Sequence, residues 1–340
     1  MNQRHLHFIC DELQLGTPDG VATSVYGSRG GSFMWRVNTE KGSYAIKQLA
    51  PVIDLKSERI IAKYELSETI AYRFAQQGIR AVSAIKKSGK HLNIIENIGY
   101  LAYPWIEGHT LSRDEILETH ALKIAEMIAK LHHINMSVPE IEAPHVDILA
   151  KDKIAKAIER AASFKYPFAK MLKENINLIL SMYDSYLTVI PLLLEGTVVT
   201  HGDVDRLNVL WDKSDQAILV DWESARKLNP TREIVRASLG WSGLGTENFS
   251  LPLYTHMLRT YIKSGGILNI NHMNAALYSL VGSMVYWILY NVELVCNSNN
   301  PVEKNTAMQE IEGAFKTIIK FKLLMPELIK VGCECIESKK

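Results

Sequence analysis

Three polar residues in one short stretch have the types and spacing that phosphoryl transfer requires. Asn208 follows Asp203 by five residues, and Asp221 follows Asn208 by thirteen, with short apolar runs between them. Moving a phosphoryl group from a nucleotide needs a carboxylate that takes the proton of the acceptor hydroxyl. It also needs hard oxygen ligands that hold Mg²⁺ on the phosphates. The pattern therefore predicts Asp203 as the base and Asn208 and Asp221 as the metal ligands.

A short hairpin is expected to position the two metal ligands. Residues 209–211 and 217–220 are apolar and are separated by the polar segment 212–216, which is typical of two paired strands and their turn. Asn208 precedes the first strand and Asp221 follows the second, so antiparallel pairing brings both to one end of the hairpin. An ordinary surface hairpin is the alternative for any single Asp–Asn pair. The complete set of residues favours the catalytic interpretation.

The residues around these three resemble a known family. The chain has His201-Gly202-Asp203 before Asn208 and Asp221-Trp222-Glu223 after it, which is similar to the aminoglycoside phosphotransferase and choline kinase-like family. The likeness extends over about residues 21–245. Asp205 is a departure, because the family often has a histidine at this place.

The resemblance implies both a fold and a reaction. The expected fold is α+β, bilobal and protein-kinase-like, with a small N-lobe of antiparallel sheet and helix in residues 1–104 and a larger, mainly helical C-lobe in residues 105–340. The expected reaction moves the γ-phosphoryl group of ATP, or of GTP as an alternative donor, to a hydroxyl of a small molecule with the help of Mg²⁺. Aminoglycosides, amino alcohols and sugar-like compounds are the acceptors that the family suggests.

The N-terminal part supplies candidate phosphate contacts. Gly30, Gly31 and Ser32 belong to a glycine-rich loop, where backbone N–H groups can approach phosphates without obstruction by Cβ atoms. Taken alone, such a loop is equally typical of a plain hairpin turn. Lys47 lies one strand later, alternates with the apolar residues of segment 44–48, and resembles the lysine that pairs with the α- and β-phosphates. The order of loop and lysine favours nucleotide binding.

A helix predicted over residues 64–77 carries the acidic partner expected for Lys47. In kinases, an acidic residue of this helix pairs with the strand lysine and orients it. Glu68 lies nearer the apolar stripe of the helix than Glu65 does, so Glu68 is the predicted partner and Glu65 the alternative.

Residues 100–108 resemble the family's hinge, where backbone groups bind the adenine. Matching Gly108 to the glycine that closes the family's hinge assigns the acceptor role to the Pro104 carbonyl and the donor role to the Ile106 N–H. Proline lacks only a backbone donor, so Pro104 can accept a hydrogen bond. A connecting turn with core aromatic residues is the alternative for this segment.

The composition excludes several classes of protein. Lys and Arg total 38 and Asp and Glu total 37, so there is no basic footprint for nucleic acid or an anionic membrane. The four cysteines show neither a disulfide framework nor zinc spacing, and the N-terminus does not resemble a signal peptide. Residues 274–292 carry no charge, but their polar and aromatic residues at helical spacing favour a buried helix over a membrane span. We expect a cytoplasmic protein.

Two other functions compete with a small-molecule kinase. A protein Ser/Thr kinase shares the catalytic residues, but here Trp222-Glu223 stands where such kinases have Phe-Gly, and Gly202 stands where they often have Arg. A nucleotide-binding pseudokinase acting as an interaction protein usually lacks the base, the lysine or a metal ligand, and this chain has all of them.

Carboxylates near or after the catalytic loop suggest one property of the acceptor. Asp205, Glu223, Glu233 and Glu247 favour a cationic hydroxyl compound, with ordinary surface charges as the alternative interpretation.

Overall fold

The computed structural model describes residues 1–27, 31–146 and 148–337. Its contacts divide the chain into two compact units. Unit 1 consists of Met1–Ser112, Val138–Ile141 and His201–Ala225; unit 2 consists of Arg113–Ser137, Glu142–Thr200 and Arg226–Lys340. The predicted catalytic segment is therefore part of unit 1, although the expected lobe boundary after residue 104 separated it from the N-terminal sheet.

Unit 1 has an antiparallel sheet flanked by two helices. The sheet has the strand order β1-β2-β3-β5-β4. The elements of this unit are α1 (Gln3–Glu12), β1 (Thr23–Gly27), β2 (Phe33–Thr39), β3 (Gly42–Gln48), α2 (Glu58–Gln76), β4 (Asn93–Ile95), β5 (Ile98–Pro104), β6 (Gly108–His109), the 3₁₀ turn η2 (Arg206–Asn208), β8 (Val209–Asp212), β9 (Ala217–Leu219) and η3 (Trp222–Ser224).

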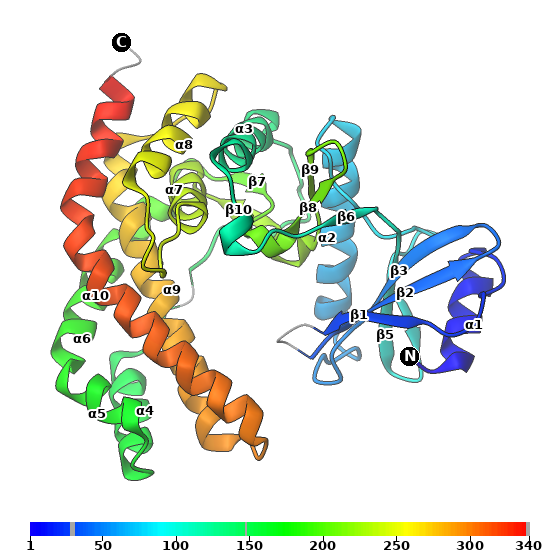
Figure 1. Ribbon diagram of the computed structural model, residues 1–340, viewed down its shortest axis with the longest axis horizontal. Coiled ribbons are helices and arrows are strands. Elements are labelled where there is room, and N and C mark those ends of the chain that lie inside the picture. Colours follow the sequence, from blue (N-terminus) through cyan, green and yellow to red (C-terminus); the bar gives the residue numbers. More distant parts are fainter. Residues whose placement is uncertain (28–30, 147, 338–340) are drawn as a thin grey trace. The chain divides into compact units, whose positions relative to one another are not determined.

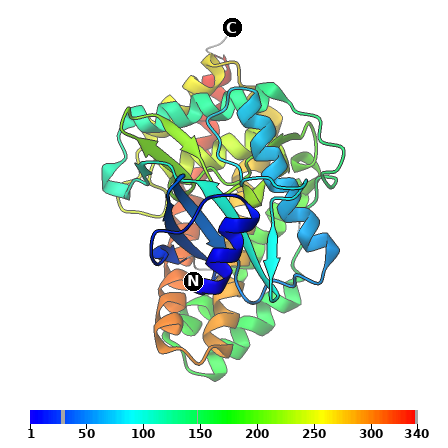
Figure 2. The same cartoon turned by 90° about the vertical axis from the view of Figure 1, so that its right-hand side faces the viewer.

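The two faces of this sheet have different roles because side chains alternate along each strand. One face packs on α1, whose Leu6 and Ile9 are buried against Ile46 and Tyr100 of the sheet. Figures 1 and 2 show α1 lying across β2 and β3. The other face carries Lys47, which alternates with Ile46 along β3. The helix α1 therefore covers the face opposite Lys47, whereas α2 contacts the lysine face, where the Tyr103 hydroxyl donates to Glu68.

The β8–β9 hairpin joins unit 1 through backbone and ring contacts. The Leu219 N–H donates to the Arg80 carbonyl at 2.8 Å, and the Val82 N–H donates to the Leu219 carbonyl at 3.0 Å. Trp222, which is buried, stacks on Phe74 of α2 with ring centroids 5.4 Å apart. These contacts explain why the hairpin groups with the N-terminal segment rather than with the helices that surround it in the sequence.

Unit 2 is mainly helical. Its elements are η1 (Arg113–Glu115), α3 (Glu118–Ile134), α4 (Lys151–Ser163), α5 (Pro167–Glu174), α6 (Ile176–Leu193), α7 (Pro230–Trp241), α8 (Leu251–Lys263), α9 (Ile270–Asn297) and α10 (Pro301–Glu337), together with the short paired strands β7 (Val198–Thr200) and β10 (Arg226–Leu228). The α+β prediction, with an antiparallel sheet in the N-terminal region and a mainly helical remainder, is confirmed.

Two interior features organise unit 2. The helix α9, which contains the uncharged segment 274–292, packs against α6, α7 and α10 (Figure 1). By length and composition alone α6 and α9 could cross a membrane, but core helices of soluble proteins meet the same criteria. A buried polar cluster joins three other helices: His132 of α3 contacts Glu233 of α7 and the Tyr261 hydroxyl of α8, each at 2.7 Å.

Candidate active site

A buried histidine connects the two loops that carry the predicted catalytic residues. His201 follows β7, and its Nδ1 accepts a hydrogen bond from the Asp203 N–H at 3.3 Å. Its Nε2 lies 3.0 Å from the Val220 carbonyl, so the ring proton belongs on Nε2. The ring also lies 4.6 Å from that of Trp222. His201 thereby holds the segment of Asp203 beside the segment of Asp221.

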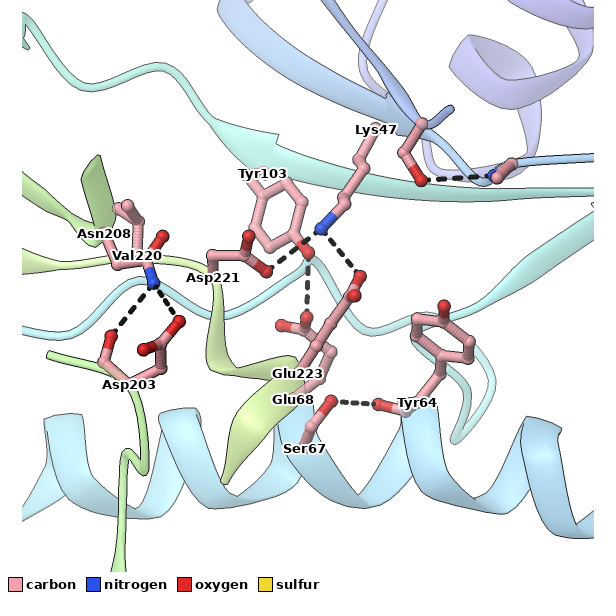
Figure 3. Close-up of polar contacts among 12 residues, drawn as sticks. Lys47, Tyr64, Ser67, Glu68, Tyr103, Asp203, Asn208, Val220, Asp221 and Glu223 are labelled. Carbon is pink, nitrogen blue, oxygen red and sulfur yellow. Dashed lines mark hydrogen bonds and ion pairs between the residues drawn. The ribbon is translucent and has the colours of Figure 1, made fainter. Parts of the chain in front are cut away.

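Asp203 and Asn208 are brought together as predicted. The Asn208 side-chain amide donates to the Asp203 backbone carbonyl at 2.9 Å and to its carboxylate Oδ2 at 3.1 Å (Figure 3). The turn η2 makes this possible because it folds the chain back within five residues, and Asp205 caps it by accepting from the Leu207 N–H. With the amide nitrogen used in this way, the Asn208 Oδ1 remains as a donor atom for a metal ion.

Asp221 lies beside Asn208 at the end of the hairpin. The Val220 N–H donates to the Asn208 carbonyl at 3.0 Å, which extends the β8–β9 ladder by one step. Asp221 itself has left-handed backbone angles, φ 60° and ψ 66°, and these turn the chain out of the strand. The antiparallel pairing predicted from the sequence therefore places both proposed metal ligands at the same end.

Lys47 reaches the same site from β3. Its ammonium lies 3.0 Å from Asp221 Oδ1 and 2.6 Å from Glu223 Oε1 (Figure 3). The side chain is only 9% exposed. Burial by itself lowers the pKa of Lys47, but the two carboxylates outweigh this effect and raise the pKa above its ordinary value. Lys47 is thus held as a charged group at the end of the catalytic hairpin.

The predicted ion pair between Lys47 and Glu68 does not form in this structure. Glu68 is buried in α2 and accepts hydrogen bonds from the Tyr103 hydroxyl at 2.8 Å and from the Ala84 N–H at 2.6 Å. Burial raises the pKa of Glu68 to about 7, although these two donors and the charge of Lys47 oppose the shift. The alternative, Glu65, accepts from backbone N–H groups instead. Lys47 instead pairs with Asp221 and Glu223, which follow the hairpin, because Tyr103 and Ala84 engage the carboxylate of Glu68.

The predicted phosphate loop is described in part. Gly30 lies outside the described residues. Gly31 has φ 81°, a backbone conformation that favours glycine. The Ser32 hydroxyl accepts a hydrogen bond from the Ala50 N–H at 3.1 Å, so the side chain of Ser32 holds the loop against the segment that follows β3.

The proposed hinge begins where β5 ends. The Trp105 N–H donates to the Ser43 carbonyl of β3 at 3.0 Å, whereas Pro104 faces Tyr44 in the neighbouring pair of the ladder. In an antiparallel ladder, hydrogen-bonded and non-hydrogen-bonded pairs alternate. The Pro104 carbonyl is therefore directed away from β3, like the Ala102 carbonyl two residues earlier, which accepts from the Ile85 N–H. This direction suits the acceptor role predicted for Pro104.

Comparison with known proteins identifies the family. The family model described as the phosphotransferase enzyme family matches residues 28–261, a range that includes every predicted site residue. The chain belongs to this family. No curated protein sequence matches it significantly.

Several solved structures share the fold of this phosphotransferase-family protein at low sequence identity. An aminoglycoside phosphotransferase from Alicyclobacillus acidocaldarius is 16% identical, with a TM-score of 0.62 over 92% of each chain. A choline/ethanolamine kinase family protein from Mesorhizobium loti is 14% identical, with a TM-score of 0.62 over 98% of this chain and 99% of the other. The spectinomycin phosphotransferase APH(9)-Ia, in complex with ADP and spectinomycin, is 15% identical, with a TM-score of 0.60 over 98% of each chain.

Three of the four carboxylates expected to attract a cationic acceptor have other partners in this phosphotransferase-family protein. Glu223 contacts Lys47, Glu233 contacts His132, and Asp205 caps η2. Asp205 and Glu247 are the two exposed carboxylates among the four. A preference for a cationic acceptor therefore stays a prediction, with Asp205 and Glu247 as its exposed carboxylates.

Sequence reasoning also missed three positioning residues in this phosphotransferase-family protein. Glu223 lies two residues after Asp221, and a second carboxylate so close to a metal ligand was the available signal for a contact with Lys47. Tyr103 pairs with Ala45 across the sheet, but nothing in the sequence indicates that its hydroxyl reaches Glu68. His201 was part of the recognised motif, yet its two hydrogen bonds depend on tertiary contacts.

Proposed function

We propose that this protein is a small-molecule kinase that transfers the γ-phosphoryl group of ATP, or of GTP as an alternative, to an acceptor hydroxyl. The observation that carries the proposal is the convergence within unit 1 of Lys47 with Asp221, and of Asp203 with Asn208. A cation for the phosphates, a carboxylate for the hydroxyl and two oxygen ligands for a metal are the parts that this reaction requires.

Asp203 is the proposed catalytic base. Its carboxylate is held by the Asn208 amide, and its backbone N–H by His201. As the acceptor oxygen bonds to the γ-phosphorus, the bond to the β-phosphate oxygen breaks, and Asp203 takes the hydroxyl proton. ADP leaves with the bonding electrons. Because catalysis in this reaction is mainly positioning and electrostatics, the fixed orientation of the carboxylate is the main contribution of these contacts.

The nucleotide is proposed to lie along the lysine face of the sheet. Lys47 would contact the α- and β-phosphates, and the backbone N–H groups of Gly30, Gly31 and Ser32 would approach the phosphates from the loop. The Pro104 carbonyl and the Ile106 N–H would bind the base. The ADP and AMP complexes of APH(9)-Ia, which has the same fold, support nucleotide binding.

The residues present fit Mg²⁺. Asn208 Oδ1 and the Asp221 carboxylate are hard oxygen donors at one end of the hairpin, and hard oxygen donors are the ligands that Mg²⁺ prefers. Among the described residues, no group of three or more His, Cys, Asp or Glu side chains could hold a metal ion by itself. Nucleotide phosphates and water would complete the shell, and the bound ion would neutralise charge on the phosphates.

The test begins with the acceptor. Nucleotide consumption in Mg²⁺ is screened over aminoglycosides, amino alcohols, sugars and nucleosides, and the best acceptor is used for Asp203→Asn. This variant should keep ATP affinity within a few-fold and lose on the order of 10²-fold or more in kcat, the usual scale for general acid–base catalysis. Asp215→Asn, in the exposed turn of the same hairpin, is the matched control and should retain the wild-type rate. Turnover by Asp203→Asn at the wild-type rate would refute the assignment of the base.

A further inference from the structure

A second cation lies on the lysine face of the sheet, at its hinge end. The Arg36 guanidinium carbon is 4.4 Å from the centroid of the Trp105 ring, a cation–π distance. Glu107 contacts both residues: its Oε1 accepts a hydrogen bond from Arg36 Nη2 at 3.3 Å and another from Trp105 Nε1 at 3.0 Å. We call these three residues the hinge cluster.

The ladder places Arg36 on the same face as Lys47. Arg36 of β2 is directly opposite Ala45 of β3, and Ala45 is two residues from Lys47. Residues opposite each other in a ladder share a face, as do residues two apart in a strand. Ala45 is in turn opposite Tyr103 of β5, the residue before Pro104. A nucleotide with its phosphates at Lys47 and its base at the hinge therefore has its nucleoside beside Arg36.

The hinge cluster also fixes the backbone that would bind the base. Trp105 lies between Pro104 and Ile106, the residues proposed to supply the acceptor and the donor. Its N–H is bonded to Ser43, its ring lies against Arg36, and its indole N–H is bonded to Glu107. With backbone and side chain both held, Trp105 sets the orientation of its two neighbours.

One donor of the cluster is buried and has no partner in the part of the chain that the structure describes. The Arg36 Nε atom is buried and lacks a hydrogen-bond partner among the described residues. The guanidinium uses its flat face for Trp105 and its Nη2 for Glu107, so the Nε–H is left for a ligand. A buried donor of this kind is stabilised by an acceptor atom that binds next to it.

We propose that the hinge cluster is a nucleoside-recognition element, in which Trp105 and Glu107 hold Arg36 so that its Nε–H donates to an acceptor atom of the bound nucleoside. This inference rests on the proposed function, since it requires a nucleotide on the lysine face. The hinge cluster then contributes to the affinity for the nucleoside, and Lys47 contributes to the affinity for the phosphates. If the cluster were merely structural, its substitution would lower the stability of the protein without selectively weakening the binding of the nucleoside.

The test compares a complete nucleotide with its two halves. Binding of ATP, adenosine and inorganic tripolyphosphate is measured by competition with a fluorescent ADP analogue in Mg²⁺, for the wild type and for Arg36→Met. Methionine keeps an apolar stem but removes the charge and all donors. We expect the variant to bind ATP and adenosine about tenfold more weakly, the scale of one hydrogen bond to a charged group, with tripolyphosphate affinity within about twofold of the wild type.

Controls make each outcome decisive. Arg4 is an exposed arginine of α1 that pairs with Glu96 at 3.5 Å, and Arg4→Met should change none of the three affinities. If Arg36→Met does not fold, Glu107→Gln and Arg36→Lys loosen the hinge cluster more gently and should show the same selective loss. Equal losses for ATP and tripolyphosphate, or no loss for adenosine, would overturn the inference. If the wild type binds no nucleotide, the proposed function fails instead.

Discussion

At the scale of single residues, the site depends on how two buried charges are compensated. Lys47 keeps its charge because Asp221 and Glu223 lie within 3.0 Å and 2.6 Å of its ammonium. Glu68 is buried without a direct cationic partner, and hydrogen bonds from Tyr103 and Ala84 compensate it only in part. Its raised pKa follows from this difference, because burial disfavours the charged form of a carboxyl group.

Glu68 should make the stability of the protein depend on pH. Its native pKa of about 7 lies above the ordinary value of 4.5, so between these values the folded state holds a proton that the unfolded state has lost. The free energy of unfolding should therefore fall as pH rises through this window, by about 3 kcal/mol at roughly 1.4 kcal/mol per pKa unit. Urea unfolding between pH 5 and pH 8 measures the slope.

The isosteric variant isolates this contribution. In Glu68→Gln the amide resembles the protonated acid: its oxygen can accept from the Ala84 N–H, and its NH₂ can donate to the Tyr103 hydroxyl oxygen. We expect the variant to lose the decline in stability that the wild type shows over the same pH range. Parallel pH profiles for the two proteins would mean that Glu68 is not the group responsible.

At the scale of elements, a close crossing of two helices stabilises unit 2. A Cβ built on Gly282 of α9 would lie 2.4 Å from the ring of Tyr186 in α6. Tyr186 is buried, so its ring has little room to move away. The glycine is therefore a packing requirement of this crossing, since protein interiors cannot absorb an extra methyl group at such a distance without shifting.

Two glycine-to-alanine variants should shift stability in opposite directions. Gly282→Ala should destabilise the protein by about 1–3 kcal/mol through overpacking against Tyr186. Gly313→Ala, in α10, is the matched control because, apart from the neighbouring backbone of its own helix, no described atom lies within 4 Å of its built Cβ. It should stabilise the protein by roughly 0.5–1 kcal/mol, since alanine loses less backbone entropy in a helix. Thermal melting of both variants gives the comparison. A neutral Gly282→Ala would show that the two helices can separate at low cost.

At the scale of the whole molecule, the proposed chemistry belongs to one of the two units. Lys47, Pro104, Asp203 and Asp221 all lie in unit 1, together with the hinge cluster. Unit 2 has its own buried polar cluster around His132, which joins three helices. Nucleotide binding should therefore affect the two units differently.

Hydrogen exchange should locate the nucleotide in unit 1. At a hundredfold excess over Kd, a ligand that binds only the folded state adds about 2.7 kcal/mol of stability. With Mg²⁺ and ATP we expect slower amide exchange in β3, around Pro104 and Trp105, and in His201–Ala225. Excess chelator should reduce the protection near Asn208 and Asp221. Protection confined to Arg226–Lys340 would place the ligand elsewhere.

The sequence alone determined those parts of the protein that depend on local pattern. Two short apolar runs with a polar turn between them predicted the β8–β9 hairpin, and antiparallel pairing of these strands necessarily brings Asn208 and Asp221 to one end. The contact between Asn208 and Asp203 could also be predicted, because Asn208 follows Asp203 by only five residues. The helix around Glu68 was predicted from its apolar spacing, although it begins at Glu58 rather than at residue 64.

Only the tertiary structure decided which charged groups meet. Lys47 could have paired with the helix or with the hairpin, and the outcome depended on the Tyr103 hydroxyl and the Ala84 N–H, which engage Glu68 from segments distant in sequence. The contact of Arg36 with Trp105 likewise joins β2 to the residue that follows β5, two strands that β3 separates in the sheet. A periodic pattern reports which face of an element is buried. It carries no information on which buried polar atom finds which partner, because that choice depends on distances set by the packing of the whole unit.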